Sequence, residues 1–195
     1  MTFFICGVPG TGKTSIVSFL KNDFSVIELG NVIKEKKLYT FFDERTGSFV
    51  INEEEVDRVA RGLYGENVII EWIDLSFLSE QPNGVILLRT NPVVLKKRLE
   101  SRNYPDSKVR ENVMAELLGV IRKNLSDKWH DKTIDFDTTA TSPKEAAEAV
   151  RDIITGKIQP KEVIDWLSIM DPEELDQLIG QLDSFKSHSG ELPLS

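Results

Sequence analysis

Residues 3–15 read FFICGVPGTGKTS, an apolar run that leads into a loop rich in glycine, lysine and threonine. The segment GVPGTGKT matches the pattern G-x-x-x-x-G-K-[ST], in which Gly7 and Gly12 are the glycines and Lys13 and Thr14 follow. Glycines let the backbone wrap closely around phosphate oxygens, and the helix expected after the loop adds its positive N-terminal end. The stretch therefore predicts a strand, a phosphate-binding loop and a helix in succession.

The polar residues of this loop have distinct predicted roles. Lys13 is expected to neutralise charge on the β- and γ-phosphates, and the Thr14 hydroxyl is expected to ligate Mg²⁺. Cys6, directly before the loop, is predicted to be a small buried core residue rather than a nucleophile. A glycine-rich turn can also cap a helix without binding a ligand, so the rest of the chain must support the interpretation.

The composition is that of an acidic globular protein. The 195 residues carry 24 Lys and Arg against 32 Asp and Glu, a net charge of −8. A broad nucleic-acid surface is therefore not expected, because phosphate contacts need a basic face. One cysteine excludes an internal disulfide, no apolar run approaches the roughly 18 residues of a membrane-spanning helix, and the N-terminus lacks the charged region of a signal peptide. We expect a cytoplasmic protein, or a nuclear one if the source has a nucleus.

Strand-like runs alternate with helix-like stretches along the first 156 residues. The expected strands cover residues 2–6, 25–29, 67–72, 84–90 and 133–138. Several of these runs, such as VIIEW and GVILL, are apolar without alternation, which is typical of strands buried on both faces. The pattern predicts an α/β fold of the P-loop NTPase type, with a five-stranded parallel sheet flanked by helices.

The chain beyond Gly156, a C-cap candidate, is expected to form a separate acidic helical extension over residues 157–195. This extension holds three lysines against eight acidic residues and ends in a tail, SHSGELPLS, that is predicted to be disordered. Its two short helical patterns place Val163, Ile164, Leu167 and Met170 on one face and Leu175, Leu178, Ile179 and Leu182 on another. Helices of this length are not stable alone, so they must pack on each other, on the body or on a partner. Trp166 lies off the first face, and its burial against the core is favoured over partner binding.

An arginine-rich run, LLRTNPVVLKKRLESRNYPDSKVREN, follows the fourth expected strand and contains Arg89, Arg98, Arg102 and Arg110. Phosphoryl transfer needs positioning and positive charge around the transferring group. Arg98 and Arg102 are four residues apart on one helix face, so a short lid could close them over the phosphates. A solvated basic face paired with nearby glutamates is the alternative. A GTPase is not favoured, because the guanine-reading motif N-K-x-D is absent, and the core is small for a large ATPase.

Carboxylates at the end of the third expected strand are the next candidates. Glu71 follows the run VII there, and ligands of such sheets sit at the carboxyl ends of strands. Its carboxylate could orient Mg²⁺-bound water or activate the acceptor phosphate. Asp74 is the competing choice, although its position past the strand is more typical of a helix cap. Ser142 to Glu145, after the fifth strand, has the pattern of a capping box.

Five segments together resemble the adenylate kinase isoenzyme 6 family in order and spacing, over about residues 1–155. They are GVPGTGKTS, ELGNVIKEKKLYTFFDERTGSFVINEEEVDRV, VIIEW, LLRTNPVVLKKRLESRNYPDSKVRENVMAE and DTTATSPKEAAE. Members of this family are small nucleoside-monophosphate kinase-like ATPases of archaea and eukaryotes that also assist assembly of the small ribosomal subunit. The resemblance implies Mg²⁺-dependent phosphoryl transfer from ATP to AMP, with ATP hydrolysis as a second activity.

The resemblance also implies site residues. The family's ATP site falls on Gly10, Gly12, Lys13, Thr14 and Ser15, with its adenine-contacting turn near Ser142 and its lid arginine at Arg102, in a lid of residues 101–111. The monophosphate-binding region falls on residues 28–51, where Asn31 and the Leu38-Tyr39 pair lie. In the resulting hypothesis Lys13 and Arg102 hold the transferring phosphoryl group, Arg98 assists from the lid, and Thr14 and Glu71 place the metal.

The chain departs from the family at two places. The family has Asp-x-His at the end of the third strand, where this chain has Glu71-Trp72-Ile73, so the carboxylate is kept and the histidine is lost. The acidic extension has no role that the resemblance implies.

Two other functions stay open. One is an ATP-dependent switch with little kinase activity that binds ribosomal protein uS11, whose basic tail would suit an acidic surface. The other is a small-metabolite kinase of the shikimate or gluconate type, which the lysines after the second strand do not exclude.

Overall fold

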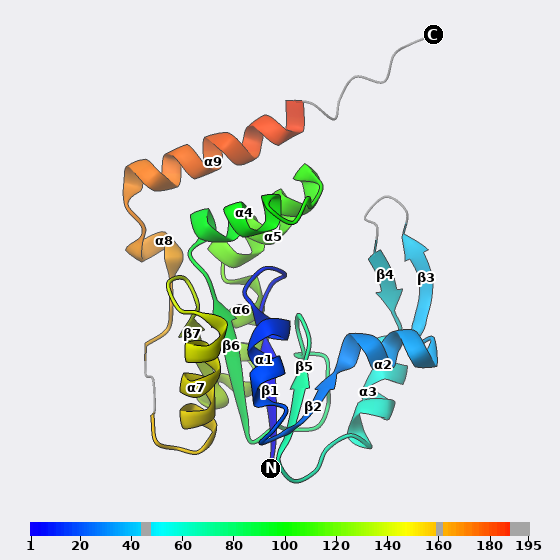
Figure 1. The fold of residues 1–195 in the computed structure, drawn as a ribbon. Helices are drawn as coiled ribbons and strands as arrows, with labels where there is room; N and C mark the ends of the chain where they lie inside the picture. The colour runs from blue at the N-terminus through cyan, green and yellow to red at the C-terminus, as the bar shows by residue number, and fades with distance from the viewer. Residues whose placement is uncertain (44–47, 159–161, 188–195) are drawn as a thin grey trace.

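The structure, a computed structural model, describes residues 1–43, 48–158 and 162–187. A five-stranded parallel sheet forms its centre, in the order β2-β5-β1-β6-β7 (Figure 1). The strands are β1 (Thr2–Cys6), β2 (Ser25–Glu28), β5 (Val68–Glu71), β6 (Gly84–Arg89) and β7 (Thr133–Asp137). The five predicted strands are therefore all present, each with ends within one residue of the predicted ones, and the predicted α/β fold is confirmed.

The three central strands, β5, β1 and β6, are largely apolar because both faces of the sheet are covered there. Neighbouring residues of one strand enter opposite cores: Phe4 packs on one face of β1, and Ile5 packs on the other. In β5, Ile69 and Ile70 divide in the same way. A strand that must fill two cores cannot alternate apolar with polar residues, which explains runs such as VIIEW.

Helices form the two outer layers (Figure 1). One face is covered by α1 (Lys13–Leu20) and α7 (Pro143–Ile154). The other is covered by α2 (Leu29–Lys36), α3 (Glu53–Arg61), α4 (Pro92–Glu100), α5 (Asp106–Leu117) and α6 (Val120–Trp129), which leads into the short 3₁₀ turn His130–Lys132. Asn91 caps α4 by accepting a hydrogen bond from Val93 N at 2.9 Å, and Ser142 forms the predicted capping box of α7 with Glu145.

A hairpin stands apart from the main sheet. Its strands, β3 (Tyr39–Asp43) and β4 (Ser48–Ile51), pair antiparallel with each other, and the sequence analysis did not predict them. Tyr39 and Phe42 both pack on Phe49, with ring centroids 4.4 Å and 5.0 Å away. Because Phe41, Phe42 and Phe49 stay largely exposed, these strands lack the buried apolar pattern that identifies the others.

The extension after Gly156 is only partly as predicted. Its first helix, α8 (Trp166–Ile169), has four residues. Asp165 fixes its start as the N-cap, because the Asp165 side chain accepts a hydrogen bond from Leu167 N. The shared face predicted for this helix is right for Met170, which is buried, and for Ile164, which packs against the core. It is wrong for Val163 and Leu167, which are exposed. Trp166 is buried, as favoured.

The second helix of the extension, α9 (Pro172–Ser187), crosses over α4 and α5 in Figure 1. It buries Leu178 and Leu182, as predicted, and exposes Ile179. The predicted disordered tail lies outside the described residues from residue 188 onward.

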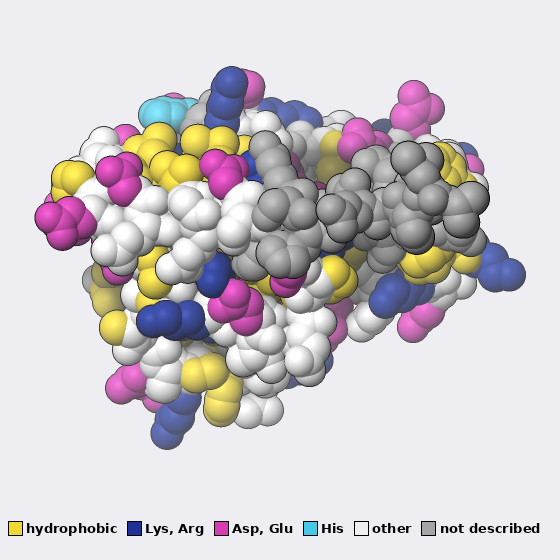
Figure 2. Space-filling view, turned by 90° about the horizontal axis from the view of Figure 1, so that it is seen from above, with side chains coloured by type: hydrophobic (Ala, Val, Ile, Leu, Met, Phe, Trp, Pro, Cys, Tyr) yellow, Lys and Arg dark blue, Asp and Glu magenta, His cyan; other side chains and the backbone are white. Residues whose placement is uncertain are grey.

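The surface agrees with the mixed composition. On the face seen in Figure 2, Lys and Arg side chains are scattered among Asp and Glu side chains rather than gathered into a basic patch. Among the helices of residues 1–43, 48–158 and 162–187, none is long and apolar enough to cross a membrane.

Candidate active site

The loop between β1 and α1 has a backbone that only glycine adopts without strain. Gly7, Gly10 and Gly12 have φ values of 147°, 94° and 96°. A Cβ atom on Gly10 would lie 2.7 Å from Leu95 Cδ1, and one on Gly7 would lie 2.7 Å from the carbonyl oxygen of Leu88. The glycines of the motif are therefore required by both conformation and close packing.

The loop is tied to the strand ends around it. Gly7 N donates to the carbonyl of Ile73 at 3.0 Å, and Thr138 Oγ1 donates to the carbonyl of Thr11 at 2.9 Å. Among the residues that the structure describes, no side chain caps the start of α1, where Gly12 is the N-cap. The first N–H groups of this helix are consequently left for a ligand, and the helix end favours an anion.

Lys13 lies beneath this loop and is 8% exposed. Its Nζ donates to the carbonyls of Gly7 at 2.7 Å and Val8 at 3.2 Å. Burial lowers the pKa of Lys13, and the nearby Glu71 carboxylate acts in the opposite direction. The ammonium thus rests on backbone carbonyls, from which an arriving phosphate group could draw it.

Glu71 is the buried carboxylate that faces Lys13. It ends β5 and is 7% exposed. Burial raises its pKa, and the charge of Lys13 partly offsets this effect. Within the described part of the chain, no hydrogen bond reaches its side chain, so the carboxylate oxygens are open to a ligand.

Asp74, the competing carboxylate, is already engaged. One of its oxygens accepts from Ser76 N and the other from Asn124 Nδ2, each at 2.8 Å. Asp74 holds a turn and not a helix, so its prediction as a helix cap is wrong. The two contacts leave Glu71 as the available carboxylate at this edge of the sheet.

A first pocket, of about 260 Å³, lies on the α7 side of the loop. It is lined by Gly10, Thr11, Gly12, Ser15, Ile16, Arg98, Ser101, Arg102, Thr138, Thr141, Pro143 and Ala146. We call it the α7-side pocket. Ser142 itself does not line this pocket, because its side chain caps α7, but both of its neighbours do.

A second pocket, of about 430 Å³, lies on the α2 side of the same loop. It is lined by Pro9, Gly10, Gly12, Lys13, Thr14, Ser15, Glu28, Gly30, Asn31, Lys34, Glu71, Trp72, Ile73, Arg102 and Tyr104. We call it the α2-side pocket. Of the predicted monophosphate-binding residues, Asn31 lines it, whereas Leu38 and Tyr39 lie in or against the core.

The two pockets share Gly10, Gly12, Ser15 and Arg102. Arg102 lies in the five-residue turn between α4 and α5, so the predicted lid consists of this turn and the start of α5. Its side chain is exposed and makes no hydrogen bond within the described residues. A free cation therefore stands where the two pockets meet.

The other arginines of the run are already held. Arg98 Nη2 donates to the carbonyls of Thr138 at 2.7 Å and Thr139 at 3.1 Å, which places Arg98 firmly at the wall of the α7-side pocket. Arg89 is buried in ion pairs with Glu116 and Asp135, and Arg110 pairs with Asp183 of α9. Only Arg98 and Arg102 of the four line the pockets.

Sequence reasoning missed several residues of the α2-side pocket. The Trp72 indole lies so close to Gly30 that a Cβ there would be 2.3 Å from the ring. Trp72 and Tyr104 give the pocket aromatic walls. The position of Trp72 next to Glu71 at a strand end was the available signal, whereas the approach of Gly30 depends on tertiary packing.

The residues fit a Mg²⁺–nucleotide complex. The described residues contain no cluster of three or more His, Cys, Asp or Glu side chains that could hold a metal alone. Mg²⁺ in phosphoryl-transfer sites is usually held by one or two protein oxygens together with substrate phosphates. The exposed Thr14 hydroxyl and the open Glu71 carboxylate line one pocket and supply such oxygens.

Comparison with known proteins assigns the chain to a family. Residues 4–119 match the family described as an AAA domain. A protein of Saccharolobus islandicus named "Putative adenylate kinase" is 32% identical, over 94% of this chain and 99% of its own. Two further proteins of the same name are similar to the same degree. The one from Methanosarcina barkeri is 33% identical, over 87% of this chain and 100% of its own. The one from Methanocaldococcus jannaschii is 34% identical, over 85% of this chain and 93% of its own.

Solved structures with the same fold include two shikimate kinases. The enzyme from Bacteroides thetaiotaomicron superposes with a TM-score of 0.54 at 18% identity, over 80% of this chain and 98% of its own. The one from Acinetobacter baumannii, in complex with shikimate, has a TM-score of 0.54 at 16% identity, over 80% and 93%. These likenesses show the fold of P-loop kinases. From its loop and its relatives, the chain belongs to the AAA-domain family of P-loop proteins and to the family of the relatives named "Putative adenylate kinase".

Proposed function

We propose that the protein is a nucleotide kinase that transfers a phosphoryl group from ATP to AMP. The observation that carries this proposal is the pair of pockets on either side of one phosphate-binding loop, with Arg102 in both. Direct transfer needs a donor and an acceptor on opposite sides of the migrating group. A hydrolase needs only the nucleotide pocket and room for a water molecule.

The α7-side pocket is the proposed ATP site. The free N–H groups of the loop and of α1 suit the phosphates, and the turn from Thr138 to Pro143 borders the place where the adenine would lie. Arg98, fixed by its two carbonyl contacts, adds positive charge to this wall. Gly10, Gly12 and Ser15 complete the proposed contacts.

The residues between the pockets are the proposed transfer machinery. Lys13 and Arg102 are placed to hold the transferring phosphoryl group, whose charge spreads over its oxygens in the transition state. Thr14 and Glu71 would hold Mg²⁺, which when bound neutralises charge on the phosphates. No covalent enzyme intermediate is needed, because the acceptor phosphate is a competent nucleophile once it is clamped beside ATP.

The α2-side pocket is the proposed acceptor site. Lys34 and Asn31 offer a cation and an amide for a monophosphate, and Trp72 and Tyr104 offer flat apolar faces to a nucleobase. The adenylate kinase name of the relatives favours AMP among nucleoside monophosphates.

A second function, ATP hydrolysis that drives partner binding in small-subunit assembly, rests on the sequence resemblance to the isoenzyme 6 family. The net charge of −8 suits a basic partner such as ribosomal protein uS11. Ile73, which lines the α2-side pocket where that family has histidine, argues for transfer over hydrolysis. A cytoplasmic location accords with both functions. A pull-down with uS11, with and without ATP, tests this second function, and absence of binding in both conditions would reject it.

An acceptor screen tests the kinase proposal. ADP formation from Mg-ATP is followed by a coupled assay with AMP, CMP, dAMP, shikimate or no acceptor, beside a Lys13→Ala control. We expect AMP to raise the rate far above the ATP-only rate in the wild type and not in the control. Stimulation by shikimate alone would instead indicate a small-metabolite kinase. If none of the acceptors raises the rate above the ATP-only rate, phosphoryl transfer is rejected.

A further inference from the structure

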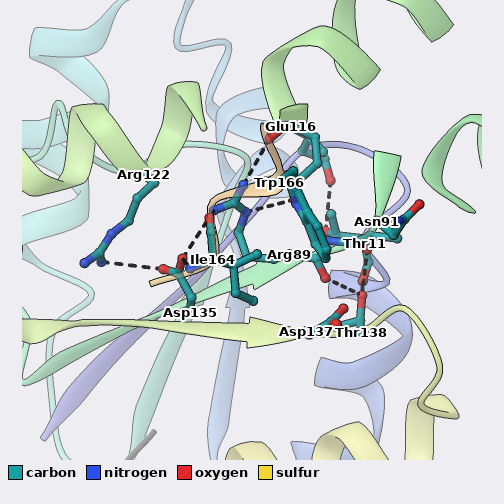
Figure 3. A network of polar contacts seen from close by, with 12 residues as sticks. Thr11, Arg89, Asn91, Glu116, Arg122, Asp135, Asp137, Thr138, Ile164 and Trp166 are labelled. Carbon is teal, nitrogen blue, oxygen red and sulfur yellow. Dashed lines mark hydrogen bonds and ion pairs between the residues drawn. The ribbon is translucent and has the colours of Figure 1, made fainter. Parts of the chain in front are cut away.

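One carboxylate oxygen joins three separate parts of the chain. Glu116 in α5 is 3% exposed, and its Oε1 accepts from Arg89 Nε at 2.8 Å, Thr90 N at 3.0 Å and Trp166 Nε1 at 2.8 Å (Figure 3). Arg89 ends β6 and Thr90 follows it, whereas Trp166 belongs to the extension. The extension therefore shares a hydrogen-bond acceptor with the strand that borders the phosphate-binding loop.

The extension also supplies hydrogen-bond partners to the buried charged side chains around this oxygen. Ile164 N donates to Asp135 Oδ2 at 2.9 Å, and the Ile164 carbonyl accepts from Arg89 Nη1 at 2.9 Å. Trp166 is 4% exposed, so its indole covers the cluster. Without these residues, Arg89, Glu116 and Asp135 would each lose a partner in a buried environment, where an unmade hydrogen bond is costly.

A short chain of contacts leads from this cluster to the proposed ATP site. The hydroxyls of Thr90 and Thr138 lie 2.7 Å apart and share a hydrogen bond. Thr138 Oγ1 donates to the carbonyl of Thr11 in the loop, and the Thr138 carbonyl accepts from Arg98 Nη2 at 2.7 Å. Thr90 is thus bonded to Glu116 through its N–H and to Thr138 through its hydroxyl, and the Thr138 carbonyl holds Arg98.

The second half of the extension packs on α5 and lies beside α4. Leu178 and Leu182 of α9 are 2% and 1% exposed and belong to the core that includes residues of α4 and α5. Asp183 of α9 pairs with Arg110 of α5 at 3.4 Å. The groove between α4 and α9 is lined by Val93 and Leu178, among others. The helix that follows the lid turn is therefore packed against α9, and the helix that precedes it lies beside α9 across this groove.

We propose that residues 164–182 form a brace that positions the lid arginines, with Trp166 and Glu116 as positioning residues. By fixing α4 and α5, the brace confines movement on closure to the turn at residues 101–105 and keeps Arg98 and Arg102 aligned with the transferring phosphoryl group. The kinetic side of this proposal rests on the proposed transfer to AMP.

Two substitutions at Trp166 in the full chain separate hydrogen bonding from packing. Trp166→Phe keeps an aromatic ring and loses the N–H donor, whereas Trp166→His reduces packing and keeps a donor. We expect kcat for ADP formation from ATP and AMP to fall about tenfold or more in the Phe variant, with KM for ATP changed less, because small misplacements of catalytic groups lower kcat steeply. The His variant should retain more activity than the Phe variant. Leu167→Ala, at the exposed neighbouring position, is the matched control and should behave as the wild type.

Hydrogen exchange followed by mass spectrometry gives a readout that does not depend on the acceptor. In the Phe variant, well below its unfolding temperature, amides of residues 98–110 should exchange faster than in the wild type and in Leu167→Ala. In the wild type, residues 164–170 should be protected together with α5, because the two segments open together. This second comparison holds even if the Phe variant does not fold.

The outcomes distinguish the brace from the proposed reaction. A wild type that gains no rate from AMP rejects the reaction, and the exchange data still test the brace. A Phe variant that melts earlier but keeps the kcat and the lid exchange of Leu167→Ala would overturn the brace. Rapid exchange of residues 164–170 in a wild type whose α5 stays protected would overturn it as well.

Discussion

The molecule holds two buried clusters of charge that differ in how completely the protein satisfies them. Around Arg89, the guanidinium donates to Glu116, Asp135 and the Ile164 carbonyl, and the cluster lies beneath the extension (Figure 3). Beside the loop, Lys13 donates only to backbone carbonyls, and no hydrogen bond reaches the Glu71 carboxylate within the described residues. The second cluster also opens into a pocket.

The difference separates a structural role from a chemical one. A buried charge with a full set of protein partners stabilises one arrangement, and removing a partner destabilises the fold. A buried charge whose partners are incomplete is placed for a ligand, and its perturbed pKa is typical of functional sites. Substitutions in the two clusters should therefore change different measured quantities.

The largest effect is expected at Lys13. Lys13→Ala removes the buried cation that is proposed to hold the transferring phosphoryl group, and we expect ADP formation to fall about 1,000-fold, the upper range for loss of one preorganised charge donor. The free energy of unfolding should change little, because no carboxylate is directly bonded to the ammonium. Steady-state kinetics and urea denaturation of the same samples check both statements, and equal stability loss in the two clusters would contradict the comparison.

The opposite pattern is expected for Arg89. Arg89→Met leaves Glu116 and Asp135 buried without their shared cation, so the free energy of unfolding should fall by about 3–5 kcal/mol. Arg151→Met is the matched control, because Arg151 pairs with Asp23 on the surface and should contribute less than about 1 kcal/mol. Urea denaturation measures the free energy of unfolding of both variants. If Arg89→Met and Arg151→Met lose similar amounts of it, burial does not determine how much an ion pair contributes here.

Arg102 should affect activity alone. Arg102→Ala removes the exposed cation common to both pockets, and we expect kcat to fall about 100-fold without loss of stability, in the lower range for loss of one preorganised donor. Arg58→Ala in α3 is the control, because within the described part of the chain the Arg58 side chain has only an exposed ion pair, with Glu55. An Arg102 variant with wild-type kcat would place the lid cation elsewhere.

The smallest effect is expected at Ile73. Ile73→His restores the residue of the resembling family at a side chain that is 38% exposed, while the Ile73 carbonyl that holds Gly7 is unaffected. Transfer to AMP should change less than about threefold, because surface substitutions of this kind disturb little. ADP and phosphate release are measured with and without AMP. A large gain in hydrolysis without AMP would show that this position selects between the two reactions.

The sequence predicted the features that follow from local chemistry. The glycine-rich loop, the five strands and the cap at Ser142 each depend on short-range rules, and all are present in the structure. The buried Cys6 is also as predicted, and burial raises the pKa of its thiol well above the usual range.

The rest depended on contacts between distant segments. The β3–β4 hairpin escaped prediction because its exposed aromatic residues pair with each other and not with the core. Arg89 could not be separated from the pocket arginines in the sequence, since its burial depends on Glu116 and on the extension. The sequence pattern placed Trp166 off the shared face because it assumed a helix from residue 163. In the structure α8 begins at Trp166, after its cap Asp165.

The central claim is that the open cluster passes a phosphoryl group from ATP to a bound monophosphate. ³¹P nuclear magnetic resonance of the wild type with Mg-ATP and AMP follows the destination of that group directly. We expect each ATP and AMP consumed to give two ADP, with no matching rise in inorganic phosphate, and the Lys13→Ala variant to form neither ADP nor inorganic phosphate. Release of inorganic phosphate at a rate that AMP does not change would contradict it.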